Sequence, residues 1–219
     1  MIIQMFLSGF FFWLIIITNL ASVRFGYETF SDLDADTKLQ QINNDPKKFK
    51  ISVVLILIEH GSIIALAVLL FFTFSPYNII LAVVWTVFRI GEGLIQIYNK
   101  RNYWGLFNIA RQYSGNSGVE KNELIDLGLN ILKSKNTSFR IAQILFSIGT
   151  ITYSVLFVIY GVVPVIIGWF GIVASILYGL GNGIQLLKPD FKILWTIGGL
   201  LIFIFEIVLG GWLMIASII

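Results

Sequence analysis

Six apolar stretches run through this chain, and each is long enough to cross a lipid bilayer as a helix, which takes about 20 residues. Of the 219 residues, 57% are hydrophobic and only 12% are charged, whereas a soluble domain carries about 25% charged residues. The sequence therefore predicts an all-α fold, a polytopic membrane helical bundle that forms a single domain. The predicted spans are residues 2–22, 50–74, 77–98, 138–160, 163–187 and 192–218.

The connections between the predicted spans differ in length. Short turns near Pro76 and Pro164 join the second span to the third and the fourth to the fifth. Each of these pairs is therefore predicted to be an antiparallel hairpin of helices.

Two longer polar segments are each expected to hold one short surface helix. The helix in residues 23–49 is predicted to begin near Ser31 or Asp34. The helix in residues 99–137 has an apolar stripe at helical spacing, formed by Leu124, Leu127, Gly128, Ile131 and Leu132. It is expected to lie in the interface plane of the membrane, or else to pack on the bundle as a solvated linker.

The basic residues predict an orientation. Apart from Arg89, every lysine and arginine lies in the first, third or fifth connection or at a span end beside it. The N-terminus, the two short turns and the C-terminus carry none. By the positive-inside rule, the charged connections are expected in the cytoplasm and both termini outside the cell membrane.

Two charged residues, Arg89 and Glu92, lie near the middle of the third span. A charge at that depth costs at least ~2.5–3.5 kcal/mol, so such residues usually face a partner or a water-filled cavity. The pair therefore indicates a functional site, although a buried polar network that only holds helices together is the alternative.

Polar side chains recur at helical spacing in other spans, because residues three or four apart share one helix face. We expect them to gather on the bundle axis as a ligand-binding site or buried polar core. His60 is expected to be packed or interfacial, because neighbouring helical residues point about 100° apart and Glu59 occupies the next position. The candidate site residues are Glu59, Arg89, Glu92, Gln96, Gln143, Tyr178, Asn182 and Glu206.

The charges in this set predict how it is paired. Arg89 is effectively always protonated, and three glutamates accompany it. Full ionisation would leave an uncompensated buried excess, so one or two of the glutamates are expected to be protonated. We expect Arg89 to pair with Glu206 or Glu59 across the bundle and also to contact Glu92.

Several chemistries are excluded by composition. The chain has no cysteine and one histidine, which excludes disulfides, cysteine-ligated zinc, iron–sulfur clusters and the zinc-protease motif. No phosphate-binding loop or nucleophile elbow is present. We therefore predict no metal, no cofactor and no nucleic-acid partner, and we assign the loop lysines to topology and lipid headgroups.

Two segments resemble a known membrane family. They are DPKKFKISVVLILIEHGSIIALAVLLFFTFSPYNIILAVVWTVFRIGEGLIQ and FEIVLGGWLMI, and they resemble the family called domain of unknown function 4386. The matched positions are Arg89, Glu92, Glu206 and Trp212. The resemblance implies a six-helix bundle and carries no activity. Relatives tend to have basic residues at the N-terminus and in the short turns, which implies cytoplasmic termini, opposite to the orientation predicted above.

Three functions remain open from the sequence. The first is binding or transport of a lipid-like or amphipathic small molecule, with membrane lipids as the surrounding partners. The second is an integral membrane enzyme acting on lipid with a glutamate as general base, although no nucleophile–base pair can be identified. The third is a structural or accessory membrane subunit.

Overall fold

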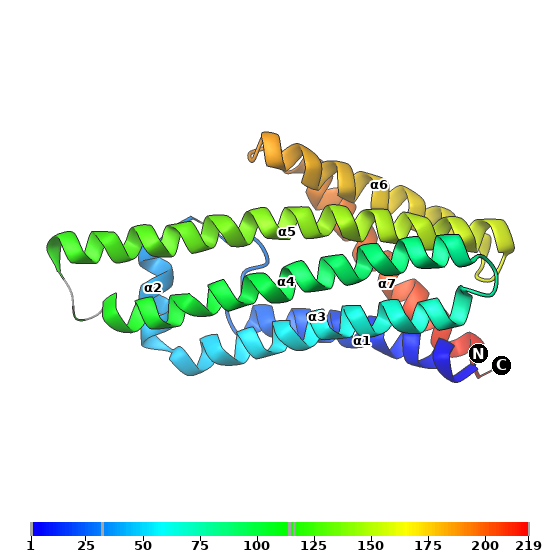
Figure 1. Cartoon of the computed structure of the whole chain (residues 1–219), viewed down its shortest axis with the longest axis horizontal. Coiled ribbons are helices and arrows are strands. Elements are labelled where there is room, and N and C mark those ends of the chain that lie inside the picture. Colours follow the sequence, from blue (N-terminus) through cyan, green and yellow to red (C-terminus); the bar gives the residue numbers. More distant parts are fainter. Residues whose placement is uncertain (1, 32, 114, 116, 219) are drawn as a thin grey trace.

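The computed structural model describes residues 2–31, 33–113, 115 and 117–218. Within these residues, all the regular secondary structure is helical. All the helices except α2 are long and apolar enough to cross a membrane, which confirms the predicted all-α, polytopic class. The helices, shown in Figure 1, are α1 (Ile2–Arg24), α2 (Ala35–Asn44), α3 (Pro46–Phe74), α4 (Ile79–Tyr113), α5 (Gly118–Tyr160), α6 (Val165–Leu187) and α7 (Ile193–Ala216).

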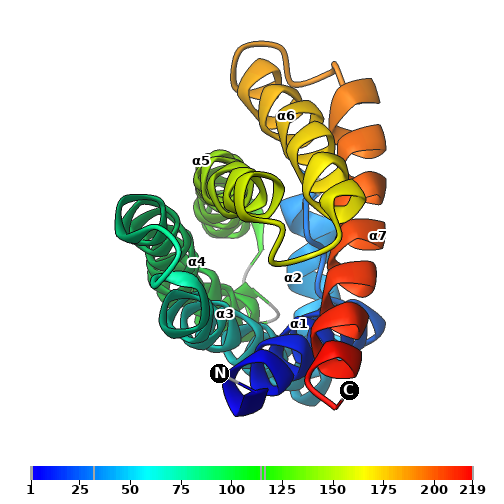
Figure 2. The same ribbon diagram turned by 90° about the vertical axis from the view of Figure 1, so that its right-hand side faces the viewer.

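The six long helices form a closed ring, which Figure 2 shows end-on. Each helix packs against two neighbours, in the order α1, α3, α4, α5, α6, α7 and back to α1. Within the described part of the chain, helices on opposite sides of the ring make no close backbone contact. The axis of the ring is therefore filled by side chains, and the inward faces decide what it holds.

The two ends of the ring differ in character. Both termini and the short α3–α4 and α5–α6 turns lie at one end (Figure 1). At the other end α4 and α5 extend well beyond their predicted spans and α2 packs across them (Figure 1). The basic connections are therefore at this second end.

The prediction of a separate helix in the interface plane within residues 99–137 is wrong. Residues 118–137 are the first part of the continuous helix α5, because no helix-breaking residue separates them from the fourth span. The apolar stripe packs against protein: Leu124 and Leu132 are buried in one cluster with Leu39 of α2. Leu127 of the stripe is 53% exposed, but the buried part of the face packs on α2 and so belongs to the protein core.

Helix α2 begins directly after Asp34, which is one of the two predicted starting positions. The Asp34 carboxylate accepts hydrogen bonds from the Thr37 hydroxyl, at 2.7 Å, and from the Thr37 backbone N–H, at 3.0 Å. These bonds satisfy one of the free N–H groups of the first turn and hold the pKa of Asp34 below its usual range. The same first turn is fastened to α4 by the Tyr113 hydroxyl, which donates to Asp36.

The interior is divided into two large apolar clusters along the axis. One, at the terminal end, includes Phe12, Trp85, Phe157 and Phe205. The other, at the charged end, includes Tyr103. Buried polar side chains of the predicted spans lie between these clusters, so the polar groups form a layer across the ring.

Helices α6 and α7 approach each other closely through glycines. A Cβ on Gly198 would lie 2.5 Å from the backbone nitrogen of Tyr178, and a Cβ on Gly181 would lie 2.5 Å from that of Trp195. Real Cβ atoms do not come this near to backbone. The two glycines therefore set the spacing of α6 and α7, and with it the position of the side chains that these helices direct inward.

A charged cavity inside the ring of helices

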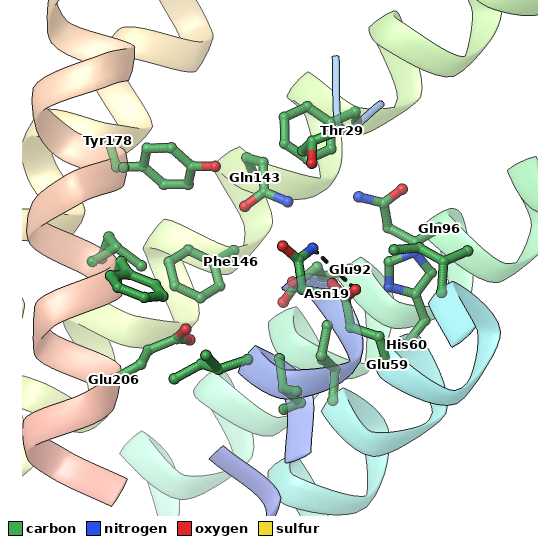
Figure 3. Close-up of a pocket in the computed structure, with 18 of the residues that line it drawn as sticks. Asn19, Thr29, Glu59, His60, Glu92, Gln96, Gln143, Phe146, Tyr178 and Glu206 are labelled. Carbon is green, nitrogen blue, oxygen red and sulfur yellow. Dashed lines mark hydrogen bonds between the residues drawn. The ribbon is translucent and has the colours of Figure 1, made fainter. Parts of the chain in front are cut away.

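A cavity of about 200 Å³ lies within the polar layer. All six long helices and the loop between α1 and α2 contribute side chains to its wall (Figure 3). Ile63 belongs to the apolar cluster at the terminal end and Ile56 to the cluster at the charged end, and both line the cavity. The cavity is therefore bounded at each end by apolar side chains and around its middle by polar ones.

The deepest wall of the cavity is formed by α3 and α4. Arg89, Glu92 and Gln96 are three and four residues apart, which places them on one face of α4, and each is only 2% exposed. Glu59 and His60 of α3 are also buried and line the same wall. Five polar side chains thus face one cavity at a depth where the lipid outside offers no hydrogen bonds.

Arg89 is paired along its own helix. Its Nη1 lies 2.8 Å from Glu92 Oε2, and its guanidinium carbon lies 4.5 Å from the centre of the Phe146 ring on α5. The absence of a side chain at Gly149 makes room for the arginine stem, because a Cβ there would lie 2.9 Å from Arg89 Cγ.

The predicted contact of Arg89 with Glu92 is confirmed, whereas the predicted pairing of Arg89 with Glu206 or Glu59 across the bundle is wrong. In the described residues its ion pair is with Glu92. A carboxylate three residues further along the same helix is within reach without crossing the cavity, whereas Glu59 projects from the neighbouring helix α3 and Glu206 from α7 on the opposite side.

Glu59 has a partner that the sequence reasoning missed. Asn19 of α1 donates from Nδ2 to Glu59 Oε2 at 3.0 Å. The available signal was an amide near the C-terminal end of an otherwise apolar first span.

His60 is part of the cavity wall as well. It is 4% exposed, and neither ring nitrogen has a hydrogen-bond partner among the described residues. His60 is therefore packed, which is one of its two expected placements, and it lines the same cavity as Glu59 because the cavity contacts both positions of α3 (Figure 3).

Glu206 lies on α7, at the opposite side of the cavity from Glu59 and His60 (Figure 3). It is partly exposed, and within the described ranges no side chain forms a hydrogen bond or an ion pair with it. Glu206 is thus the carboxylate that has no protein partner.

The other predicted site residues divide into two groups. Gln96, Gln143 and Tyr178 line the cavity with the charged residues. Asn182 is buried outside the lining, where its Nδ2 donates to the Tyr178 carbonyl at 2.9 Å, one turn back on α6. Seven of the eight candidates therefore surround one cavity, and the eighth bonds to its own helix.

The loop between α1 and α2 closes the charged end of the cavity through Tyr27 and Thr29. Lys135 of α5 holds this loop: its ammonium donates to the carbonyls of Glu28, at 2.5 Å, and Thr29, at 3.1 Å, and to the Ser31 hydroxyl, at 2.9 Å. The sequence assigned all connection lysines to topology, but Lys135 is 1% exposed and fully bonded.

The exposed part of the lining indicates where the cavity opens. Lining residues on α3 and α4 are buried, whereas Asn19 on α1, Thr29 of the loop, Gln143 on α5 and Glu206 on α7 are partly exposed. Phe203 on α7 is 39% exposed. The close contact of α1 with α7, through Gly9 and Gly210, is at the terminal end, and the helices separate toward the other end (Figure 1). The mouth therefore lies between α1 and α7, on a face that a bilayer would cover.

A ring of six membrane-length helices around a charged cavity defines a polytopic α-helical membrane protein. The chain belongs to the family described as Domain of unknown function (DUF4386), whose model matches residues 7–216. This membership confirms the resemblance seen in the sequence. No curated protein and no solved structure matches the chain. Among the described residues, no group of three or more histidine, aspartate or glutamate side chains is arranged to hold a metal ion.

Proposed function

We propose that this protein binds a small amphipathic or lipid-like molecule in the cavity between its six long helices, and that it does so as a binding protein or transporter. The observation that carries the proposal is the cavity itself, of about 200 Å³, with charged groups on one wall and isoleucine and phenylalanine side chains beside them. Pockets of this composition, largely apolar with a few convergent polar groups, are typical of small-molecule sites.

The state of the polar groups favours a ligand site over a purely structural network. Buried polar groups are nearly always hydrogen-bonded, yet both nitrogens of His60 lack a partner among the described residues. Arg89 Nη1 and Glu92 Oε2 form a close ion pair but no aligned hydrogen bond. A network that served only to join helices would leave fewer such groups facing a cavity.

The position of the mouth supports a ligand that dissolves in the bilayer. An opening between α1 and α7 faces lipid, and Phe203 at its edge is apolar. A molecule with an apolar tail and a polar head would enter from the membrane and place its head against charged groups of the cavity lining.

Filling the cavity is expected to abolish binding. A Cβ on Gly199 would be 3.4 Å from the nearest atom of the Tyr178 ring, so it would not clash with backbone atoms. Because Gly199 lines the cavity, a larger side chain there would take up cavity space. Native mass spectrometry after reconstitution in total membrane lipid is expected to show one retained small molecule on the wild type. Gly199→Leu should reduce that retention at least about tenfold, the equivalent of about 1.4 kcal/mol.

Gly211→Leu is the matched control for this experiment. It lies on the same helix, and a Cβ there meets nothing within 4 Å. This variant should retain the small molecule as the wild type does, with a similar melting temperature for both variants. Equal retention by Gly199→Leu and Gly211→Leu would contradict the proposal.

The orientation is proposed from the basic residues, with the extended ends of α4 and α5 in the cytoplasm and both termini outside. Because the chain has no cysteine, single substitutions report it cleanly. Val119 and Ile218 are both exposed, at the two opposite ends of the molecule. In intact cells, a membrane-impermeant maleimide should label Ile218→Cys, and it should label Val119→Cys only after permeabilisation. The reverse pattern would place the termini in the cytoplasm, as the family tendency implies.

A further inference from the structure

The charged groups that line the cavity do not balance. The lining contains Arg89 and the three carboxylates of Glu59, Glu92 and Glu206. The arginine is already engaged by Glu92, at 2.8 Å. The cavity therefore has an excess of carboxylates over basic groups, and its unmatched members are Glu59 and Glu206.

The two unmatched carboxylates differ in what surrounds them. Glu59 accepts a hydrogen bond from Asn19, and the buried ammonium of Lys100 is close enough for its charge to act on Glu59. Lys100 does not line the cavity, because it lies beside the Tyr27 ring of the loop and donates to Gln96. Glu59 thus has both a hydrogen-bond donor and a positive charge within the protein.

Glu206 has neither. The positive charge that acts on it is Arg89, which is already paired with Glu92. Its carboxylate lies at the α7 side of the cavity, beside the mouth, where Phe203 is exposed. Two aromatic rings also line the cavity, those of Phe146 and Tyr178. They pack edge to face, with their ring centres 5.9 Å apart.

A second observation points to a ligand in the same space. His60 is buried at 4% exposure, lines the opposite wall, and has no hydrogen-bond partner for either ring nitrogen among the described residues. Figure 3 shows its ring on the cavity side of α3, across from Glu206. A partnerless histidine facing a partnerless carboxylate is the arrangement of a site that receives a polar group.

We propose that the ligand is an organic cation: an amine with an apolar tail, whose ammonium group lies against Glu206. This inference rests on the proposed function and adds the charge of the molecule. Arg89 already lies over the Phe146 ring, but Tyr178 and Phe203 also line the cavity with Glu206. A carboxylate and aromatic rings in one lining favour substituted ammonium groups, through charge and through the negative faces of the rings. The apolar tail would lie along Ile15, Ile63 and Ile202, which line the cavity between the charged groups.

An anionic ligand fits these charges poorly. Arg89 is the basic residue of the lining, and Glu92 occupies it. An incoming anion would share the guanidinium with Glu92 and would face the carboxylates of Glu59 and Glu206. A neutral ligand would supply no counter-charge, so Glu206 would be either an unpaired charge, which is costly in a membrane-embedded site, or protonated. A cation is the ligand that favours the ionised carboxylate.

The test compares three probes that share an eight-carbon tail and differ in charge: octylamine, octanol and octanoate. The full-length protein is placed in phosphatidylcholine nanodiscs at neutral pH, and binding of each labelled probe is measured by scintillation proximity, with empty nanodiscs subtracted for partitioning. Octylamine is expected to bind saturably, and octanol and octanoate at least about tenfold more weakly. Glu206→Gln should weaken octylamine at least about tenfold, whereas Glu123→Gln, at an exposed position of α5 far from the cavity, should not.

The outcomes separate this inference from the function on which it rests. If octanol or octanoate binds saturably and as tightly as octylamine, the cation preference is overturned and the proposed amphiphile site stands. If octylamine binds equally well to wild type and Glu206→Gln, the role of Glu206 is overturned. If none of the three probes binds saturably, the proposed function fails and this inference fails with it. Should Glu206→Gln not fold, competition among the three probes on the wild type still decides the charge preference.

Discussion

Replacing Arg89 with leucine is expected to lower the free energy of unfolding by about 3–5 kcal/mol, the usual cost of removing one partner of a buried ion pair. The reason is that Glu92 is 2% exposed and its ion pair within the described residues is with Arg89. The guanidinium contact with the Phe146 ring is lost as well. Thermal unfolding followed by tryptophan fluorescence in nanodiscs measures the effect.

Second substitutions identify which carboxylate depends on Arg89. Arg89→Leu combined with Glu92→Leu should recover most of the lost stability, because an apolar replacement of a whole buried pair is often close to neutral. Arg89→Leu combined with Glu206→Gln should recover little, since no ion pair joins these two residues in the described structure. Arg101→Leu, at an exposed position of the same helix, is the control and should leave the melting temperature unchanged.

The result that would contradict this reading is a normal melting temperature for Arg89→Leu. Glu92 would then be stable in the membrane without Arg89, and the pair would have no part in holding the wall of the cavity. Recovery by Glu206→Gln that equals recovery by Glu92→Leu would instead support pairing across the cavity.

Replacing Gly198 with alanine is expected to separate α6 from α7 and to destabilise the protein by about 1–3 kcal/mol, as overpacking of a close contact does. The added methyl group would lie 2.5 Å from the Tyr178 nitrogen and 2.6 Å from its Cα. These are backbone atoms, so no side-chain rotation relieves the clash and one helix must move. Tyr178 and Glu206 would move with the helices that carry them, and probe binding should therefore fall together with the melting temperature.

Glycines on the same two helices provide the controls. A Cβ on Gly183 of α6 or on Gly211 of α7 meets nothing within 4 Å. Alanine at either position should leave stability unchanged or raise it, because glycine in a helix is less favourable than alanine by about 1 kcal/mol. A loss of stability at these positions equal to that at Gly198 would show that helix propensity, and not the α6–α7 contact, explains the effect.

Much of the site was predictable from the sequence because its residues repeat at helical spacing. Gln96, Arg89 and Glu92 share a face of α4 whatever the helix packs against, so their presence in one cavity wall follows from the period alone. Asn182 shares a face with Tyr178 for the same reason, yet its amide bonds to the Tyr178 carbonyl instead of reaching the cavity. Periodicity assigns a residue to a face, but it does not say how far along the helix a cavity extends.

The errors have a common origin in contacts between distant segments. The apolar stripe of residues 118–137 has the pattern of a helix in the membrane interface, and only the position of α2 shows that protein covers it. The sequence position of Lys135 is typical of a lysine that sets membrane topology. In the structure, however, its ammonium donates hydrogen bonds to the loop carbonyls of Glu28 and Thr29. Neither partner is close in sequence.

By itself, the sequence determined the number of membrane-length helices, the depth of Arg89, Glu92 and Glu206 within them, and the family. Those properties depend on the local transfer of side chains from water to lipid, which composition and spacing record directly. The tertiary structure alone decided that, among the described residues, Arg89 has no ion pair across the cavity beyond its local pair with Glu92, that Asn19 holds Glu59, and that Glu206 stands without a partner beside the mouth. Interactions between charges fall off with distance, so these partnerships depend on shifts of a few ångströms in how the helices pack, and no local pattern in the chain encodes such shifts.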